Sequence, residues 1–130
     1  MSTSDKFERG LEVRREVLGT THVDRSLQNA TDFNRDYQTL VTEHAWADIW
    51  TRPGLDRPVR SLLVLAMTAA LGRWEEFRLH LRATRNTGAT KEQVKETLMQ
   101  VAVYAGFPAA NSAFHHAAEV YAEMDKENPS

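Results

Sequence analysis

A run of ten residues, Leu62–Leu71 (LLVLAMTAAL), contains no charged side chain and a single hydroxyl group. A helix formed by such a segment is apolar on all sides, which is typical of a helix at the centre of a globular protein. The run is far shorter than the roughly 20 residues that a membrane-spanning helix needs. We therefore expect a buried central helix against which the other segments of the chain pack.

The segments around this run have apolar residues three and four positions apart, which is the period of an amphipathic helix. The clearest example is Thr90–Gly106, where Thr90 and Gln93 have the spacing of a capping box. Gly106 follows as a helix stop. The apolar stripe of this helix comprises Val94, Leu98, Val101 and Ala102.

Turn residues set the limits of the remaining helices. We predict helices over residues 5–19, 31–50, 73–87 and 108–126, a short helical turn within 20–30, and a break at Pro53–Gly54. No segment shows the sustained two-residue alternation of a β-strand. The sequence predicts an all-α, single-domain bundle of about six helices over residues 1–130, since 130 residues fit one domain.

Composition excludes several classes of function. The 16 basic and 18 acidic residues give a net charge of −2, which provides no general attraction for nucleic acid or an anionic membrane. The absence of cysteine excludes disulfides, thiolate metal sites and thiol redox chemistry. The N-terminal segment lacks the apolar stretch of a signal peptide. We therefore expect a cytoplasmic protein.

Glu76 and His80 lie one helical turn apart within residues 73–88. A carboxylate at this distance can hold an imidazole in one orientation and tautomer, which suits a proton donor. The alternative is a surface pair that contributes about 0.2–0.5 kcal/mol, and the spacing alone favours it. Iron sites on helical bundles use Glu and His three residues apart. Because both Glu76–His80 and His115–Glu119 are four apart, we expect no metal.

Arginines gather at the turn before the central helix, at positions 52, 57 and 60. The N-terminus of a helix disfavours cations, so Arg57 and Arg60 need a negative partner there. One interpretation is that these arginines bind an anionic ligand, because a guanidinium can donate two parallel hydrogen bonds to a carboxylate. The other is pairing with Asp56, and the sequence favours neither.

Two further groups are ambiguous between packing and binding. Trp46 and Trp50 lie one turn apart and lead into Arg52, which fits either a packed core or the wall of a pocket. Asn111 and His115 share one face of the last helix, among small residues.

Several motifs in fixed order resemble the carboxymuconolactone decarboxylase family over about residues 10–122, the core of the expected domain. They are DFN (32–34), AWADIWTRPGLD (45–56), EEFRLHLRAT (75–84), EQVKETLMQVAVYAG (92–106) and PAANSAFH (108–115). The resemblance implies an alkyl-hydroperoxidase-D-like bundle with partly flexible termini. The peroxidases of that wider group use a Cys-x-x-Cys pair, and this chain has no cysteine. A peroxidase is therefore excluded on chemical grounds.

The resemblance also implies a reaction. Members of the family decarboxylate 4-carboxymuconolactone to 3-oxoadipate enol-lactone in the protocatechuate branch of the β-ketoadipate pathway. No cofactor is expected, because the lactone ring itself accepts the electron pair that the departing CO2 leaves behind. The partner would be a small dicarboxylate lactone. Family members form homo-oligomers, commonly hexamers built as trimers of dimers.

The same resemblance gives roles to individual residues. His80 would donate the proton or stabilise the oxyanion, and Glu76 would orient it. Arg52 or Arg60 would hold the acetate arm of the substrate. The further pocket residues carried over are His22, Trp46, Asn111 and His115. Two rival hypotheses remain, a non-catalytic helical oligomer that binds an acidic metabolite and a metal-dependent enzyme.

Overall fold

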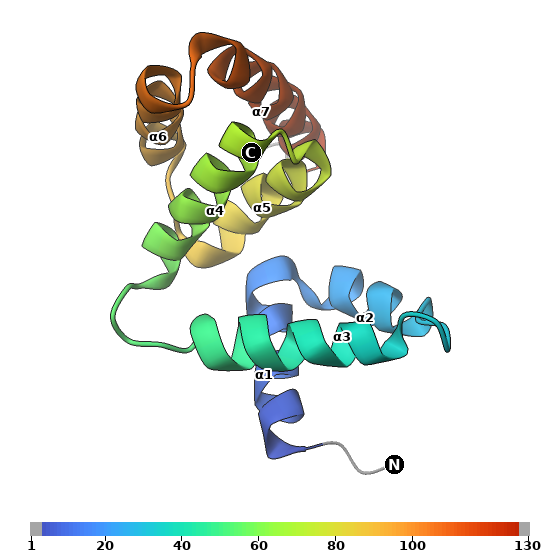
Figure 1. The fold of residues 1–130 in the computed structure, drawn as a ribbon. Coiled ribbons are helices and arrows are strands. Elements are labelled where there is room, and N and C mark those ends of the chain that lie inside the picture. Colours follow the sequence, from blue (N-terminus) through green and yellow to red (C-terminus); the bar gives the residue numbers. More distant parts are fainter. Residues whose placement is uncertain (1–3, 128–130) are drawn as a thin grey trace. The chain divides into compact units, whose positions relative to one another are not determined.

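The computed structural model describes residues 4–127, and within them it contains helices and turns but no strand (Figure 1). The all-α prediction is confirmed. The partly flexible ends predicted for the chain fall in part on residues 1–3 and 128–130, which lie outside the described residues. The chain divides into two compact units, an N-terminal unit that ends at Asp56 and a C-terminal unit that begins at Arg57. The assignment of one domain stays a prediction.

The N-terminal unit consists of three α-helices and one π-helix. They are α1 (Asp5–Leu18), α2 (Thr20–Gln28), α3 (Arg35–Val41) and the π-helix η1 (Thr42–Ile49). Ser4 caps α1, because its side chain accepts a hydrogen bond of 3.0 Å from the backbone N–H of Phe7. Gly19 has φ of 95° and separates α1 from α2, so the predicted short helical turn is a nine-residue helix.

The predicted helix over residues 31–50 exists from Arg35, but its second half is not α-helical. The backbone N–H of Trp50 reaches Ala45 O at 3.1 Å, five residues back, as in a π-helix. Helix α1 crosses η1 at Gly10, where an added Cβ would collide with the carbonyl oxygen of Thr42. Glycine at this point therefore allows the two backbones to approach closely.

The C-terminal unit contains four α-helices around one apolar cluster. They are α4 (Arg57–Leu71), α5 (Trp74–Thr87), α6 (Lys91–Tyr104) and α7 (Phe107–Glu127). The predicted capping box of α6 is present, with 3.1 Å from Gln93 N to Thr90 Oγ1 and 2.9 Å from Thr90 N to Gln93 Oε1. The largest buried side chains of the cluster are Leu65, Phe77, Leu81 and Leu98.

Helix α4 is buried on one side only. Leu65 and Ala69 are fully buried, whereas Met67 is 59% exposed and Leu71 71% exposed. The prediction of burial on all sides is therefore wrong for the single chain, because α5, α6 and α7 pack against only part of the surface of α4. Among residues 4–127, no helix has the length and apolar character that crossing a membrane requires.

Candidate active site

His80 lies in the middle of α5 and is only 7% exposed. Its neighbours along the helix, Phe77 and Leu81, belong to the apolar cluster. The end of α5 is fixed to α4 by a buried hydrogen bond of 2.7 Å from Ser61 Oγ to Thr87 Oγ1. This bond holds α5 beside the first turns of α4.

Glu76 forms no bond with His80 in the described structure. Its side chain is exposed, and in the described part of the chain no hydrogen bond or ion pair links the two residues. Glu76 lies in the first turn of α5, where a carboxylate interacts favourably with the positive end of the helix dipole. The role of Glu76 as the group that orients His80 stays a prediction, and this geometry does not itself supply the orienting bond.

The opposite side of α5 binds α7 through charged and aromatic groups that the sequence interpretation missed. Arg78 Nη1 lies 3.0 Å from His116 Nδ1, and its Nη2 lies 3.2 Å from Glu123 Oε1. The ring of His116 stacks on Trp74 with centroids 4.8 Å apart. Arg78 and His80 are two residues apart, about 200° around the helix, so His80 points away from this network.

Asn111 and His115 are exposed on α7. Asn111 lines a depression of about 620 Å³ between α6 and α7, together with apolar residues such as Val103 and Phe114. His80 is buried in α5, on the side away from the contact with His116. In the described part of the chain, no hydrogen bond, ion pair or ring contact joins His80 to Asn111 or His115.

Arg60 is half-buried in the first turn of α4, next to the buried Ser61. Arg57 begins the same helix, so two of the three arginines that the sequence groups together lie in the first turn of α4. An anion at this place would meet both the guanidinium groups and the helix dipole.

The other three predicted residues belong to the N-terminal unit. Trp46 is 5% exposed on η1, and its ring stacks on Trp50 with centroids 5.0 Å apart and an interplanar angle of 24°. Arg52 is exposed in the turn after η1, where its backbone N–H donates to Ile49 O at 3.1 Å. His22 is half-buried on α2. The unit thus supplies a rigid aromatic pair followed by an arginine.

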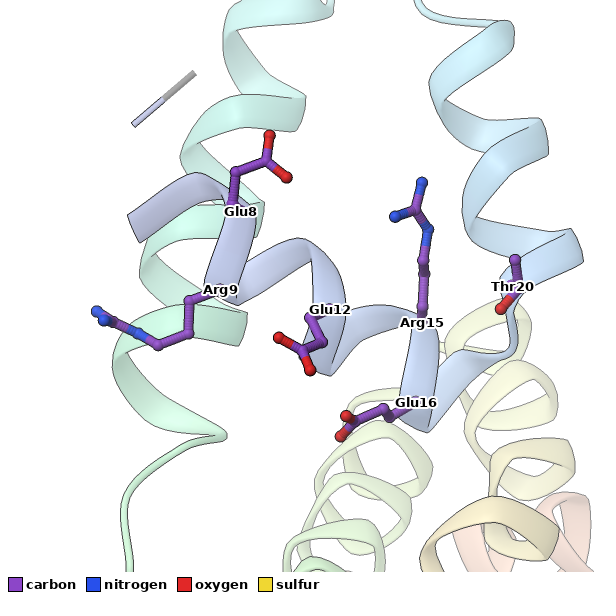
Figure 2. Close-up of a pocket in the computed structure, with 6 residues that line it drawn as sticks. All are labelled: Glu8, Arg9, Glu12, Arg15, Glu16 and Thr20. Carbon is purple, nitrogen blue, oxygen red and sulfur yellow. The ribbon is translucent and has the colours of Figure 1, made fainter. Parts of the chain in front are cut away.

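A polar depression of about 530 Å³ lies along α1 and the start of α2 (Figure 2). Its side chains fan out along the helix and do not converge on one point, and Arg15 is engaged with Asp24 at 2.8 Å. None of the predicted site residues lines it. The lining comprises Glu8, Arg9, Glu12, Arg15, Glu16 and Thr20.

Within residues 4–127, no three His, Cys, Asp or Glu side chains come together in a group that could hold a metal ion. Four polar residues in the described part of the C-terminal unit are buried as a whole, one histidine and three residues with a hydroxyl group. They are Ser61, His80, Thr84 and Thr87. An imidazole among hydroxyls and apolar side chains can exchange a proton with a ligand in surroundings that contain little water.

Comparison with known proteins identifies the relatives of the chain. A model of the carboxymuconolactone decarboxylase family matches residues 35–119. The 4-carboxymuconolactone decarboxylase of Acinetobacter baylyi is 48% identical over 124 residues, which are 95% of this chain and 92% of that protein. The nitrosuccinic acid decarboxylase of Metarhizium robertsii is 44% identical over 107 residues, 82% of this chain and 75% of that protein.

A third relative, a 4-carboxymuconolactone decarboxylase of Pseudomonas putida, is 44% identical over 48 residues, which are 37% of this chain and 100% of that sequence. The family model covers more than half of the chain, and the Acinetobacter protein aligns with nearly all of it. The chain belongs to the carboxymuconolactone decarboxylase family.

Proposed function

We propose that this protein is a cofactor-independent decarboxylase that converts 4-carboxymuconolactone to 3-oxoadipate enol-lactone and CO2. The observation that carries the proposal is the 48% identity to a protein of that name over 95% of the chain. The buried histidine of α5 is the structural feature that fits the chemistry. The reaction would belong to the protocatechuate branch of the β-ketoadipate pathway.

The substrate sets simple demands on the protein. The bond between the ring carbon and the leaving carboxylate breaks, and its electron pair moves through the C=C bond to the carbonyl oxygen of the lactone. CO2 leaves, and a proton then adds at the α-carbon of the resulting dienolate. The protein must therefore hold the second carboxylate, stabilise the oxyanion and deliver one proton. A well-placed general acid contributes about 10²–10⁴-fold in rate.

His80 is our candidate for the proton donor or oxyanion partner. A donor in a site with little water is worth more than one in bulk solvent, and removal of an oxyanion donor typically costs about 2.7–4 kcal/mol. The burial of His80 supports this role. Glu76 stays a candidate for the orienting group, with movement of its exposed side chain required before it could bond to the imidazole.

An arginine, Arg52 or Arg60, is proposed to bind the acetate arm. A guanidinium forks onto a carboxylate that persists through the reaction, whereas a clamp on the leaving carboxylate would slow its loss. An apolar wall suits the leaving group better, and Trp46 is proposed to form it. His22, Asn111 and His115 stay secondary candidates for the pocket.

A second substrate follows from the Metarhizium relative, whose name makes it a nitrosuccinic acid decarboxylase. Nitrosuccinate and 4-carboxymuconolactone share a succinate unit in which the carbon that loses CO2 also carries an electron-accepting group. That group is a nitro group in one acid and the unsaturated lactone in the other. The lactone is the first candidate here because its relative is more similar and covers more of the chain.

A homo-oligomer is proposed as well, with the hexamer of the family as its form and the cytoplasm as its location. Helix α4 exposes a stripe of four apolar side chains, each four residues from the next, which a second copy could cover. The stripe comprises Val59, Leu63, Met67 and Leu71. Light scattering should give the mass of six chains, and Met67→Glu should lower it. A wild-type mass of one chain would contradict the oligomer.

The deciding experiment incubates the purified protein with 4-carboxymuconolactone and, separately, with nitrosuccinate, and measures CO2 and the ring product. Turnover of the lactone that persists after dialysis against a chelator supports the proposal. Stabilisation against heat by the lactone without CO2 release would instead favour the non-catalytic binding protein. Loss of activity on chelation would favour the metal-dependent enzyme.

A further inference from the structure

The π-helix η1 allows close packing against α1 where the two helices cross. Arg14 of α1 donates from Nη1 to Gln38 Oε1 at 3.1 Å and to Thr42 Oγ1 at 3.2 Å. Gly10, one turn earlier in α1, lies against the backbone of Thr42. Thr42 is fully buried between these two contacts.

The next contact along the crossing involves Ala47. A Cβ built at Gly10 would lie 3.2 Å from the Cβ of Ala47, so only a small side chain fits opposite this glycine. Thr42 and Ala47, which both face Gly10, are five residues apart. In an α-helix, residues five apart differ by about 140° in direction, and both could not face α1. The i to i+5 hydrogen bonds of a π-helix bring them onto one face.

Without the π-helix, a tryptophan would meet α1 at this point. Residues four apart share a face of an α-helix, so a continued α-helix would place Trp46 on the same side as Thr42. An indole cannot occupy the space opposite Gly10. The π-helix places Ala47 there and turns Trp46 aside, where its ring stacks on Trp50 at 5.0 Å.

We propose that Trp50 is a positioning residue, which together with the π-helix fixes the indole of Trp46 as a rigid apolar wall against the departing carboxylate. The inference rests on the proposed decarboxylase function. Both rings are buried, Trp46 at 5% and Trp50 at 9% exposure, so the wall excludes water. A carboxylate beside such a wall is poorly solvated, and its conversion to neutral CO2 relieves that cost.

The test compares Trp50→Leu with Trp50→Phe, which keeps an aromatic ring to stack on Trp46. In Trp50→Leu the loosened indole admits water to the carboxylate, so kcat should fall about 10–100-fold while KM stays level or falls. Trp50→Phe should stay within about threefold of the wild-type protein. Partial unfolding would also lower the apparent kcat at an unchanged KM, so kcat and KM are compared at a temperature at which thermal melting shows both variants and the wild-type protein to be folded.

Two results would overturn the proposal. One is equal kinetics for the leucine and phenylalanine variants when both melt as the wild-type protein does. The other is a raised KM at unchanged kcat, which would make the aromatic pair a simple binding surface.

A second variant addresses the π-helix itself and covers the case in which Trp50→Leu does not fold. Deletion of His44, which is exposed, leaves Thr42 and Ala47 four residues apart, so an ordinary α-helix can keep both on α1. The variant should fold and keep both tryptophans on one face, but an α-helical turn changes the angle between them, so their near-ultraviolet circular dichroism should change and kcat should fall about tenfold. His44→Ala removes the same side chain without changing the register and should match the wild-type protein. A His44 deletion that unfolds, or one that keeps the indole signal and kcat, contradicts the proposal.

The dichroism needs no substrate, so it also separates this inference from the proposed function. If the wild-type protein releases no CO2 from the lactone, the proposed function fails whatever the indoles do. If the wild-type protein converts the lactone and the leucine and phenylalanine variants of Trp50 have equal kinetics, only the positioning role of Trp50 fails.

Discussion

The two units of this protein are stabilised in different ways. The N-terminal unit depends on one helix crossing, where Gly10 touches the backbone of Thr42 and the buried Arg14 bonds to its side chain. The C-terminal unit surrounds an apolar cluster to which four helices contribute, and its charged groups lie at the edge of α5 and α7. The first arrangement depends on single atoms, whereas the second depends on the volume of many side chains.

The largest effect is expected in the core of the C-terminal unit. Leu98→Ala removes a side chain that is 1% exposed, and such truncations cost about 2–5 kcal/mol because a cavity remains. Gln100→Ala, two residues further on the exposed side of α6, should cost less than about 0.5 kcal/mol. Denaturant unfolding measures both, and a Leu98→Ala loss as small as that of the control would contradict the shared core.

A somewhat smaller but sharper effect is expected at the helix crossing. Gly10→Ala adds one carbon that collides with the Thr42 carbonyl, and overpacking of this kind costs about 1–3 kcal/mol. Gly54→Ala adds the same atom where no other atom lies within 4 Å, and should leave stability unchanged or slightly raised. Thermal melting of Gly10→Ala and Gly54→Ala measures this difference, and equal melting temperatures for the two variants would contradict it.

The smallest of the three expected effects is a gain in stability, at Tyr121. The hydroxyl oxygen of Tyr121 is buried and has no hydrogen-bond partner in the described structure. Tyr121→Phe removes this unsatisfied group while it keeps the ring under the Lys91 ammonium, and should stabilise the protein by about 1 kcal/mol. Denaturant unfolding at neutral pH measures the gain, and a destabilised phenylalanine variant would mean that the hydroxyl is satisfied in solution.

The pH dependence provides a second check on Tyr121. Burial raises the pKa of its phenol above the ordinary value of 10.0, so the folded state holds this proton more tightly than the unfolded state. The resulting stability is fully present below pH 10 and is lost as the pH rises through the folded pKa. As the pH rises above 10, the wild-type protein should therefore lose more stability than Tyr121→Phe. Parallel curves would contradict the raised pKa.

Local sequence signals were sufficient where structure depends on neighbours along the chain. The capping box of Thr90 and Gln93 and the stripe that begins at Val94 identified α6, because both lie within a few turns. The π-helix was missed because Thr42, Trp46 and Trp50 have ordinary α-helical spacing. The signal that overrides this spacing is Gly10, more than thirty residues away.

The candidate site shows the same limit. The sequence predicts His80 as a candidate site residue, and the burial of its side chain follows from the helical period around Phe77 and Leu81. His116 stacks on Trp74, which lies 42 positions away in the sequence, and no local sequence pattern predicts this contact. The sequence predicts burial for the exposed stripe of α4 as well, because composition does not show which side of an apolar helix the other helices cover.

The proposed mechanism requires His80 to transfer the proton in a decarboxylation that needs no cofactor. The most direct test measures CO2 release from 4-carboxymuconolactone by the wild-type protein and by His80→Ala, with equal melting behaviour as the condition for comparison. We expect turnover by the wild-type protein and a fall in kcat of about 10²–10⁴-fold in the variant. An unchanged kcat in a folded His80→Ala protein would contradict it.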